Sequence, residues 1–538
     1  MTARRLGIRD ERFAGLPGIE SDEHAARPAL LGRTTIGYGE LAAAVSRLAA
    51  RLCAVGAAPG GRVVIWMDKG PEYVQAILAA LRAGCAYVPV DGAHPASRVA
   101  TIVHDTEPII LFTDARRLSS IPDLPDSVRT VVVVADGAVC GAAHRMTDAV
   151  PTVGWAEFLD GDDPAPAAEI TPDSLAAILY TSGSTGAPKG VAISHRNLTA
   201  FIAWARAELA VGADDVFANH ASFNFDLSTF DLFVALSVGA AVWIVDDAQA
   251  RDAAALVAGI REHRVTVWYS VPSILVLLTA CGALTSDVVR DLRYVLFAGE
   301  VYPKPRLREL GALLGGTALY NLYGPTETNV CTYHRVTPAD LAGDDPLPIG
   351  VAVGGARLLV TDEDGHPVGG PDAFGELVVE GDCVTPGYWR RESEPMADHH
   401  RRRRHPTGDL VSWADGELVY RGRKDRMVKL SGYRIELGEI ESVALRHPAI
   451  DEAAVLVSGE GADARLTLCY TLRAGADAPT VIDLKQHCAR YLPRYMVPRA
   501  ATRVAVLPRN GNGKIDHRSL RAAVTVPAPA GEFRRIAR

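Results

Sequence analysis

The segment from residue 179 to residue 190 contains the residue types needed to hold a polyphosphate. Its sequence is Leu-Tyr-Thr-Ser-Gly-Ser-Thr-Gly-Ala-Pro-Lys-Gly, and it follows an apolar, strand-like stretch. Three glycines permit close approach of the backbone, the hydroxyls supply donors, and Lys189 adds positive charge. The spacing differs from the Walker A pattern G-x-x-x-x-G-K-[ST]. Because an isolated Ser/Gly-rich loop is more often a flexible connection, phosphate binding here depends on the other motifs of the chain.

Several charged residues elsewhere have a structural and a chemical interpretation. Asp409 in Thr-Gly-Asp can close a turn, and Lys514 in Asn-Gly-Lys can be an exposed turn lysine. Asp226 can cap a helix expected at residues 227–236. Lys189 can be solvated, as loop lysines usually are. Taken one at a time, these structural interpretations are favoured, so a chemical role requires that the motifs occur together.

Segments with helix and strand patterns alternate along most of the chain and must position these residues. Helices are expected at residues 41–53 and 71–82, and short apolar strands are expected at residues 62–67, 86–90, 130–134, 241–245, 265–269 and 294–297. Short β-rich runs between helical patterns predict an α/β fold with parallel sheets covered by helices.

The character of the chain changes at residues 355–422, where short strands are split by Gly, Pro and Asp turns. This pattern predicts a small antiparallel barrel or sheet. A smaller α+β region follows, with a helix expected at 436–446 and a strand at 453–458. We therefore predict a large domain over residues 1–424, a small C-terminal domain over 425–523, and a disordered tail over 524–538.

Composition excludes several classes of function. The chain has 538 residues, a net charge of -8 and a pI of about 6.0, which argues against a nucleic-acid partner. It has neither a signal-peptide core at its start nor an apolar run approaching the ~20 residues of a membrane helix. Its 8 cysteines form no C-x-x-C pair, which argues against a metal or redox centre. We expect a cytoplasmic protein.

A basic run occupies residues 399–405, with the sequence His-His-Arg-Arg-Arg-Arg-His. The favoured interpretation is a solvated loop. Contact with phosphopantetheine or with a carrier protein is the alternative.

The ordered motifs resemble those of the superfamily of acyl-CoA ligases, nonribosomal-peptide adenylation domains and firefly luciferases. The resemblance covers nearly the whole chain. In chain order the motifs are Leu81-Arg82-Ala83-Gly84-Cys85-Ala86-Tyr87-Val88-Pro89-Val90-Asp91, the segment 179–190, Phe225-Asp226-Leu227-Ser228, Asn321-Leu322-Tyr323-Gly324-Pro325-Thr326-Glu327, Gly387-Tyr388-Trp389, Thr407-Gly408-Asp409, Gly422-Arg423-Lys424-Asp425, Gly432-Tyr433-Arg434-Ile435-Glu436 and Asn512-Gly513-Lys514-Ile515-Asp516. The sequences of the motifs at residues 81–91 and 321–327 favour the branch of this superfamily that uses ATP and Mg²⁺ to activate amino acids as acyl-AMP.

The resemblance implies a role for each matching residue. Thr326 would contact the α-phosphate, Glu327 would bind Mg²⁺, and Lys514 would bridge the substrate carboxylate and the α-phosphate. Tyr323 would stack on adenine, and Asp409, with Arg423 beside it, would accept from the ribose hydroxyls. The remaining ATP-binding positions are Thr181, Ser182, Gly183, Ser184, Thr185, Gly186, Lys189 and Asn321. The resemblance also implies a small domain that rotates about Asp425 between two half-reactions.

The same resemblance places the amino-acid pocket. Asp226 would pair with the α-ammonium, and the other positions are Leu227, Phe230, Tyr269, Leu296, Ala298, Leu322, Val330 and Cys331. Apart from Asp226 and Lys514, no charge is expected in this pocket. Burying an unpaired charged side chain is unfavourable by several kcal/mol, so a small apolar side chain is preferred.

This set is similar to that of the stand-alone L-prolyl-AMP ligases of pyrrole natural-product pathways, which load a separate peptidyl carrier protein. No Gly-Gly-x-Ser carrier motif follows Lys514, so a carrier is expected to act in trans.

The sequence departs from the family pattern at two places. His405-Pro406 stands where an aromatic and a basic residue usually precede Thr-Gly-Asp, and Met427 stands where Gln is usual. Three alternatives stay open: adenylation of another small apolar amino acid, an acyl-CoA ligase, and a non-catalytic binding or scaffold protein. Asp226 argues against the second, and retention of Glu327, Asp409 and Lys514 argues against the third.

Overall fold

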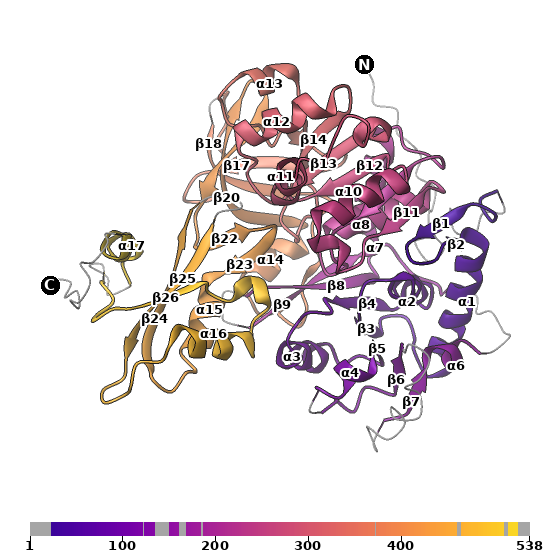
Figure 1. Ribbon diagram of the computed structural model, residues 1–538, viewed down its shortest axis with the longest axis horizontal. Helices are drawn as coiled ribbons and strands as arrows, with labels where there is room; N and C mark the ends of the chain where they lie inside the picture. The colour runs from indigo at the N-terminus through magenta and orange to yellow at the C-terminus, as the bar shows by residue number, and fades with distance from the viewer. Residues whose placement is uncertain are drawn as a thin grey trace.

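The computed structural model describes residues 23–121, 123–134, 150–160, 168–183, 187–371, 373–459, 464–509 and 515–525. Within these residues, two large sheets form the core, a small antiparallel sheet leans on them, and a C-terminal lid follows (Figure 1). The α/β fold expected from the alternating patterns is confirmed. No helix in the described part of the chain combines the length and the apolar composition that crossing a membrane requires.

The first large sheet, sheet A, is mostly parallel, and its antiparallel members lie at the two edges. Its strands, in spatial order, are β16 (Val351–Ala352), β15 (Thr332–Arg335), β14 (Ala318–Tyr323), β13 (Tyr294–Ala298), β12 (Val267–Ser270), β10 (Val216–Asn219), β11 (Ala241–Ile244), β1 (Pro28–Leu31) and β2 (Ile36–Gly37).

The second large sheet, sheet B, has the same character, with β9 and β19 antiparallel at one edge. Its strands, in spatial order, are β19 (Gly387–Tyr388), β9 (Lys189–Ser194), β8 (Leu175–Thr181), β4 (Ala86–Val90), β3 (Arg62–Trp66), β5 (Ile110–Thr113), β6 (Thr130–Val133) and β7 (Thr152–Gly154).

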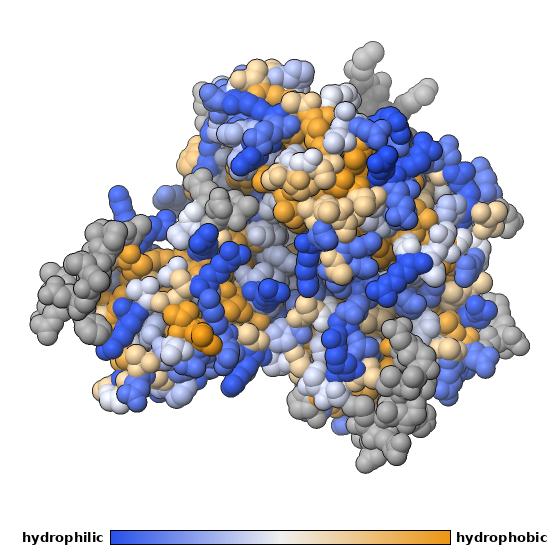
Figure 2. Space-filling view, viewed as in Figure 1, coloured by the Kyte–Doolittle hydropathy of each residue, from blue (hydrophilic) through white to orange (hydrophobic). Residues whose placement is uncertain are grey.

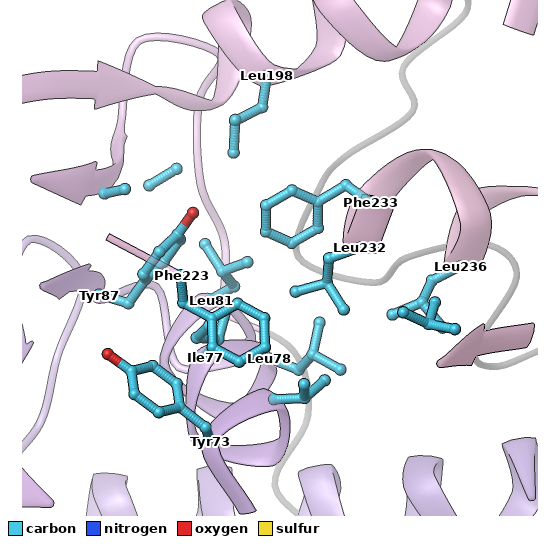
Figure 3. Close-up of a cluster of buried hydrophobic side chains, with 14 of the residues drawn as sticks. Tyr73, Ile77, Leu78, Leu81, Tyr87, Leu198, Phe223, Leu232, Phe233 and Leu236 are labelled. Atoms are coloured by element: carbon cyan, nitrogen blue, oxygen red, sulfur yellow. The ribbon is translucent and has the colours of Figure 1, made fainter. Parts of the chain in front are cut away.

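Helices lie between the sheets and on their outer faces. The inner set packs in one apolar cluster with both sheets and consists of α1 (Tyr38–Ala54), α2 (Pro71–Arg82), α6 (Trp155–Leu159), α7 (His195–Glu208) and the segment α8 (Leu227–Thr229), η1 (Phe230–Val234) and α9 (Ala235–Ser237). Figure 3 shows Tyr73 and Ile77 of α2 close to Phe223, in one cluster with the η1 side chains Leu232 and Phe233.

The outer face of sheet A is covered by α10 (Ala253–Glu262), α11 (Pro272–Ala280), α12 (Lys304–Leu314) and the short elements η2 (Gln249–Arg251), η3 (Val289–Asp291) and α13 (Pro338–Ala342). The outer face of sheet B is covered by α3 (Ala96–Thr106) and α4 (Ala115–Leu118). Within strand β3, Val63 and Ile65 face the inner cluster while Val64 and Trp66 face α3 and α4. Strands buried on both faces read as continuous apolar runs, as their sequences do.

The antiparallel subdomain expected at 355–422 is a four-stranded sheet around its own apolar cluster. Its strands are β17 (Arg357–Thr361), β18 (Phe374–Glu380), β20 (Arg404–Ala414) and β21 (Glu417–Arg423), and α14 (Met396–Arg401) precedes β20.

The lid begins after β21 with a hairpin and continues as an α+β unit with separate cores. Its elements are β22 (Met427–Leu430), β23 (Tyr433–Glu436), α15 (Leu437–Ala444), β24 (Ile450–Ser458), β25 (Arg465–Leu472), α16 (Val481–Ala489), η5 (Arg494–Met496), β26 (Ala500–Arg503) and α17 (His517–Thr525). Asp425 lies in the turn between β21 and β22, and rotation about it stays a prediction. Of the expected tail, residues 526–538 lie outside the described residues.

Gly259 provides a test of the packing on the outer face of sheet A. A Cβ atom at this position of α10 would lie 2.1 Å from the buried Trp243 ring. We expect Gly259→Ala to lower the free energy of unfolding by about 1–3 kcal/mol, as overpacking does. Gly212→Ala, where a Cβ meets nothing within 4 Å, is the control. Equal urea midpoints for the two variants and the parent protein would contradict this packing.

Candidate active site

A small cavity of about 70 Å³ lies where sheet A, the segment after β8 and the lid hairpin meet. Tyr269 and Ala298 line it from the carboxyl-terminal ends of β12 and β13, and Thr326 follows β14. Ligands of open α/β sheets bind at the carboxyl ends of the strands. The cavity therefore has the position expected of a ligand site in this fold.

The segment that follows β8 is held by the lid. Ser182 Oγ donates to the carbonyl oxygen of Arg434 at 2.7 Å and accepts from the Glu436 N–H at 3.0 Å. The N–H of Gly183 donates to Glu439 Oε2 at 3.2 Å. A Cβ at Gly183 would lie 1.9 Å from the Ala187 carbonyl oxygen, so only glycine fits this turn.

The other residues of this segment are less fully placed. Thr181 lines the cavity from the end of β8. Lys189 bonds Glu394 at 3.3 Å and lies 5.2 Å above the Tyr388 ring, so it is not a freely solvated lysine. Ser184, Thr185 and Gly186 lie outside the described residues.

Glu327 is buried and its carboxylate is paired with the lid. Arg434 Nη1 bonds both of its oxygens, at 2.9 and 2.6 Å, and Tyr388 Oη donates to it at 2.7 Å. Burial alone would favour the neutral acid, but Arg434 and the other polar neighbours outweigh it and hold the pKa of Glu327 well below its usual range. The carboxyl is therefore an anion, able to bind a cation when Arg434 withdraws.

A second buried carboxylate, Asp409, sits in the antiparallel sheet. Tyr323 Oη donates to it, and Arg423 Nη1 donates to it at 2.5 Å. The same guanidinium bonds Asp425 at 2.6 Å through each of two nitrogens. Arg423 therefore links Asp409 to the turn that enters the lid. The side-chain amide of Asn321 donates to the Pro348 carbonyl oxygen at 2.7 Å.

Asp226 and Lys429 bring opposite charges to the cavity from different elements. Burial raises the pKa of Asp226, and a hydrogen bond from Thr326 acts against this rise. Lys429 of β22 lies 5.3 Å above the Tyr323 ring, and burial lowers its pKa. The Tyr323 ring, which is expected to stack on adenine, thus has a lysine over one face in this arrangement.

The expected pocket positions divide into two shells. Asp226, Leu227, Tyr269, Ala298 and Val330 line the cavity. Phe230, Leu296, Leu322 and Cys331 are buried behind it, and Phe230 packs edge-on against Tyr269 at 5.3 Å.

The expectation that Asp226 and Lys514 are the pocket's charges is wrong, because Lys429 and Arg434 also line it. Lys514 itself lies outside the described residues. The lid supplies two further walls that the sequence analysis missed, Tyr433 and Tyr495, whose rings stack at 3.6 Å. The motif Gly-Tyr-Arg-Ile-Glu signalled that the hairpin mattered, but a motif does not say which side chains face a distant site.

The helix expected at 227–236 is interrupted by the π-helical turn η1, so it is not one regular α-helix. The Asp226 side chain makes no capping hydrogen bond at its start. The capping interpretation of Asp226 is therefore wrong, and its carboxylate is directed toward the cavity. π-turns occur frequently at functional sites.

The expectation of a solvated loop at 399–405 is wrong for two histidines. His400 on α14 and His405 on β20 are 2% and 3% exposed, while Arg401, Arg402 and Arg403 are exposed. The two rings share a hydrogen bond of 3.1 Å. Burial lowers the pKa of His400 to about 4 and that of His405 to about 3. Two neutral rings satisfy such a bond, with one nitrogen donating and one accepting.

These histidines support the Glu327 environment. The Tyr388 ring packs edge-on against His400 at 5.4 Å while its hydroxyl binds Glu327. The departure from the family pattern at His405 thus lies behind a residue that orients the buried carboxylate.

Comparisons with known proteins agree over nearly the whole chain. A family model described as AMP-binding enzyme matches residues 20–389, and one described as AMP-binding enzyme C-terminal domain matches residues 439–514. The chain is 59% identical to an L-proline--[L-prolyl-carrier protein] ligase of Streptomyces coelicolor, over 94% of this chain and 95% of that protein. It is 40% identical to a protein of the same name from Pseudomonas fluorescens, over 90% and 93%.

A solved structure gives the same result for the fold. The adenylation domain AlmE of Vibrio cholerae, in complex with glycyl-adenosine-5'-phosphate, matches with a TM-score of 0.81 and 25% identity, over 97% of this chain and 99% of that one.

The pairing of Arg434 with Glu327 can be tested by hydrogen exchange. Arg434→Met leaves a buried anion uncompensated, which is unfavourable by about 3–5 kcal/mol. We expect the lid to leave this position, so amide exchange at residues 427–436 should rise by at least roughly tenfold. Arg446→Met is the control, since Arg446 lies on the lid over the Tyr491 ring. Unchanged exchange in Arg434→Met would show that this ion pair does not hold the lid.

Proposed function

The chain belongs to the family of AMP-binding enzymes, and from that membership we propose that it converts L-proline and ATP to L-prolyl-AMP and pyrophosphate. It then transfers the prolyl group to the phosphopantetheine thiol of a separate carrier protein. The observation that carries this proposal is the 59% identity, over nearly the full length of both chains, to a protein named for that activity. The reaction uses ATP, and we place it in the cytoplasm, where ATP is abundant.

The first half-reaction joins two anions, the substrate carboxylate and the α-phosphate of ATP. Charge neutralisation and positioning supply most of the catalysis in such a reaction. We assign the β- and γ-phosphates to Thr181, Ser182 and Thr185, the α-phosphate to Thr326, and the bridging cation to Lys514. The Gly183 N–H, directed at a carboxylate oxygen of Glu439, supports this assignment, because a phosphate oxygen is an equivalent acceptor.

Glu327 fits a magnesium ion. Its carboxylate is an anion, because Arg434 and its other polar neighbours hold the pKa of Glu327 well below its usual range. One carboxylate together with substrate phosphates is the usual Mg²⁺ environment. Glu327 would hold Mg²⁺, which would neutralise charge on the substrate phosphates, and Tyr388 donates to this carboxylate and orients it.

The remaining assignments concern the nucleotide and the amino acid. We assign the ribose hydroxyls to Asp409 with Arg423 beside it, adenine to Tyr323, and the proline ammonium to Asp226. The ring of proline is compact and apolar, which suits walls made by Leu227, Tyr269, Ala298 and Val330. A secondary ammonium has two N–H donors, and Asp226 can take one as a charge-assisted bond.

We assign the present lid position to the second half-reaction. Arg434 is bonded to the Glu327 carboxylate, and Glu439 accepts the hydrogen bond of the Gly183 N–H. In this position the lid therefore engages the groups that Mg²⁺ and phosphate would need. The lid can therefore adopt this position after pyrophosphate leaves. Rotation about Asp425 would exchange the two states.

A second cavity, of about 770 Å³, lies between the lid and the core, and we assign it to the phosphopantetheine arm of the carrier protein. Its basic lining residues come from both bodies and are Arg251, Arg465, Lys485, Arg494 and Arg499. Tyr433 and Tyr495 border both this cavity and the smaller one. Hydrophilic side chains flank the boundary between lid and core on the face drawn in Figure 2.

ATP–pyrophosphate exchange over the common amino acids and pipecolate tests the proposal. We expect L-proline to give the highest kcat/KM and pipecolate to follow, because one methylene in an apolar pocket is worth about 1–3 kcal/mol. Asp226→Ala should abolish exchange, since the ammonium loses its counter-charge. A higher kcat/KM for valine, alanine or cysteine would refute proline as the substrate, and no exchange with any acid would refute the enzyme.

The two lysines should separate the half-reactions. Lys514→Ala is expected to lower adenylation by roughly 10²–10³, the effect of losing one preorganised charge contact. Lys429→Met, which removes the lysine over Tyr323 in the present lid position, should chiefly slow transfer from supplied prolyl-AMP to the carrier. Single-turnover assays of each step measure both effects. Equal losses in both steps for both variants would contradict a lid with two positions.

A further inference from the structure

Lys69 is a buried lysine directed at a loop of the other sheet. It follows strand β3 of sheet B and is 9% exposed. Its Nζ donates to the carbonyl oxygens of Asn219 at 2.8 Å, His220 at 3.1 Å and Ala221 at 2.8 Å. The first of these consecutive carbonyls ends β10 of sheet A and the other two begin the loop that follows it, so one ammonium satisfies its three donors on a single turn of backbone.

Acidic neighbours surround this lysine without forming an ion pair with its side chain among the contacts of the described residues. Asp247 accepts the Lys69 backbone N–H at 3.4 Å, and Asp231, Asp91 and Asp246 act on the ammonium through space. Lysine is almost never buried unless its charge is compensated. Here the Lys69 ammonium is stabilised directly by the dipoles of three backbone carbonyls, so its charge serves to hold the backbone of residues 219–221.

The backbone that Lys69 holds leads directly to the amino-acid pocket. Seven residues, 220–226, connect β10 to α8, and the last three of them line the small cavity. The Phe223 ring lies 5.3 Å from Lys69 Nζ. The same ring packs against Tyr73, and Figure 3 shows these two rings side by side. The first half of the loop is therefore fixed to sheet B and to α2.

The second half of the loop is fixed by the segment that follows it. Ser228 Oγ donates to the Phe225 carbonyl at 2.6 Å, and Thr229 Oγ1 donates to the Asp226 carbonyl at 2.6 Å. Lys69 and these hydroxyls thus hold the loop at its two ends. Between them, the orientation of the Asp226 carboxylate depends on both ends staying in place.

We propose that Lys69 is a positioning residue for the amino-acid pocket, holding the 219–226 loop so that the Asp226 carboxylate faces the substrate ammonium. This proposal rests on the proposed function in one respect, the role of Asp226. Lys69 is not among the residues that line the small cavity, so we expect its loss to act through the loop and to weaken amino-acid binding selectively.

The protonation state of Lys69 gives the proposal a distinct signature. A neutral amine has two N–H donors and cannot satisfy three carbonyls. Burial lowers the pKa of Lys69 to about 8, Asp247, Asp231, Asp91 and Asp246 partly oppose this, and His220 is neutral because burial lowers its pKa to about 4. The hold on the loop is therefore lost as pH rises through about 8.

Stability responds to pH in the opposite direction. Because the folded pKa lies below the unfolded value of 10.5, the unfolded chain binds more protons between these pH values. The contribution of Lys69 to stability thus rises over the range in which its hold on the loop weakens. A general loss of structure cannot produce both trends.

The experiment compares Lys69→Met, Lys69→Arg and the control Lys304→Met. Lys304, on α12, donates to one backbone carbonyl oxygen, that of Asp340. In the exchange assay we expect Lys69→Met to raise KM for the amino acid by roughly 10- to 100-fold, the effect of lost charged hydrogen bonds, with KM for ATP unchanged. Lys69→Arg, which stays charged, should recover part of the loss and move the alkaline rise in KM to higher pH. Lys304→Met should match the parent protein.

Hydrogen exchange separates failure of this proposal from failure of the proposed function. Amides at residues 219–226 should exchange faster in Lys69→Met than in the parent protein or Lys304→Met, whatever the substrate is. Equal rises in KM for the amino acid and KM for ATP, or unchanged amide hydrogen exchange at residues 219–226, would overturn the positioning role. If Lys69→Met does not fold, the parent protein decides: a KM for the amino acid that stays flat across pH 8 would overturn it too. Absence of amino-acid-dependent ATP–pyrophosphate exchange in the parent protein would instead refute the proposed function.

Discussion

A carboxylate that stays ionised when it is buried needs a counter-charge, and Glu327 imposes this requirement on the arrangement of the lid and the core. Leaving such a group unpaired is unfavourable by several kcal/mol, so whatever bonds it must be replaced and not merely removed. In the present arrangement Arg434 of the lid is its partner. The position of the lid is therefore coupled to whatever cation occupies Glu327, which joins two bodies that otherwise have separate apolar cores.

The same logic applies to the segment that follows β8. Its donors need acceptors, and Glu439 supplies a carboxylate oxygen to Gly183 where a phosphate oxygen would serve as well. Glu439 also forms a buried ion pair with Arg98 of α3 at 2.5 Å. The lid thus places the Arg434 guanidinium on the anionic Glu327, and it places the Glu439 carboxylate on the cationic Arg98 and on the Gly183 N–H. Under the proposed function, substrate phosphates with Mg²⁺ and the closed lid would be alternative partners for one set of side chains, which is what an ordered pair of half-reactions requires.

The local sequence predicted those elements whose signals lie within them. The helix expected at 71–82 begins at Pro71 and ends at Arg82 as predicted, because proline starts a helix and Gly84, with φ of +73°, follows its end. Strands β3, β4, β6, β11, β12 and β13 lie within a few residues of the apolar runs that predicted them. The helix after Asp226 was wrongly expected to be regular, because no local pattern distinguishes a π-turn such as η1 from an α-helical one. The buried positions of His400 and His405 were missed because every residue in the run 399–405 is polar or charged, so no apolar pattern marks the two side chains that are buried.

By itself the sequence determined the chemistry: a loop suited to phosphate, the acidic residues Asp226, Glu327 and Asp409, and the order of motifs that identifies the family. These follow from residue type and near-neighbour spacing, which a linear chain displays directly. Only the tertiary structure decided what those groups contact. Arg434 meets Glu327 across 107 positions of sequence, and Lys69 meets Asn219 across 150. Such pairs are chosen by how sheets and lid pack, because burial forces each charge to find its partner in space, and spacing along the chain carries no record of that choice.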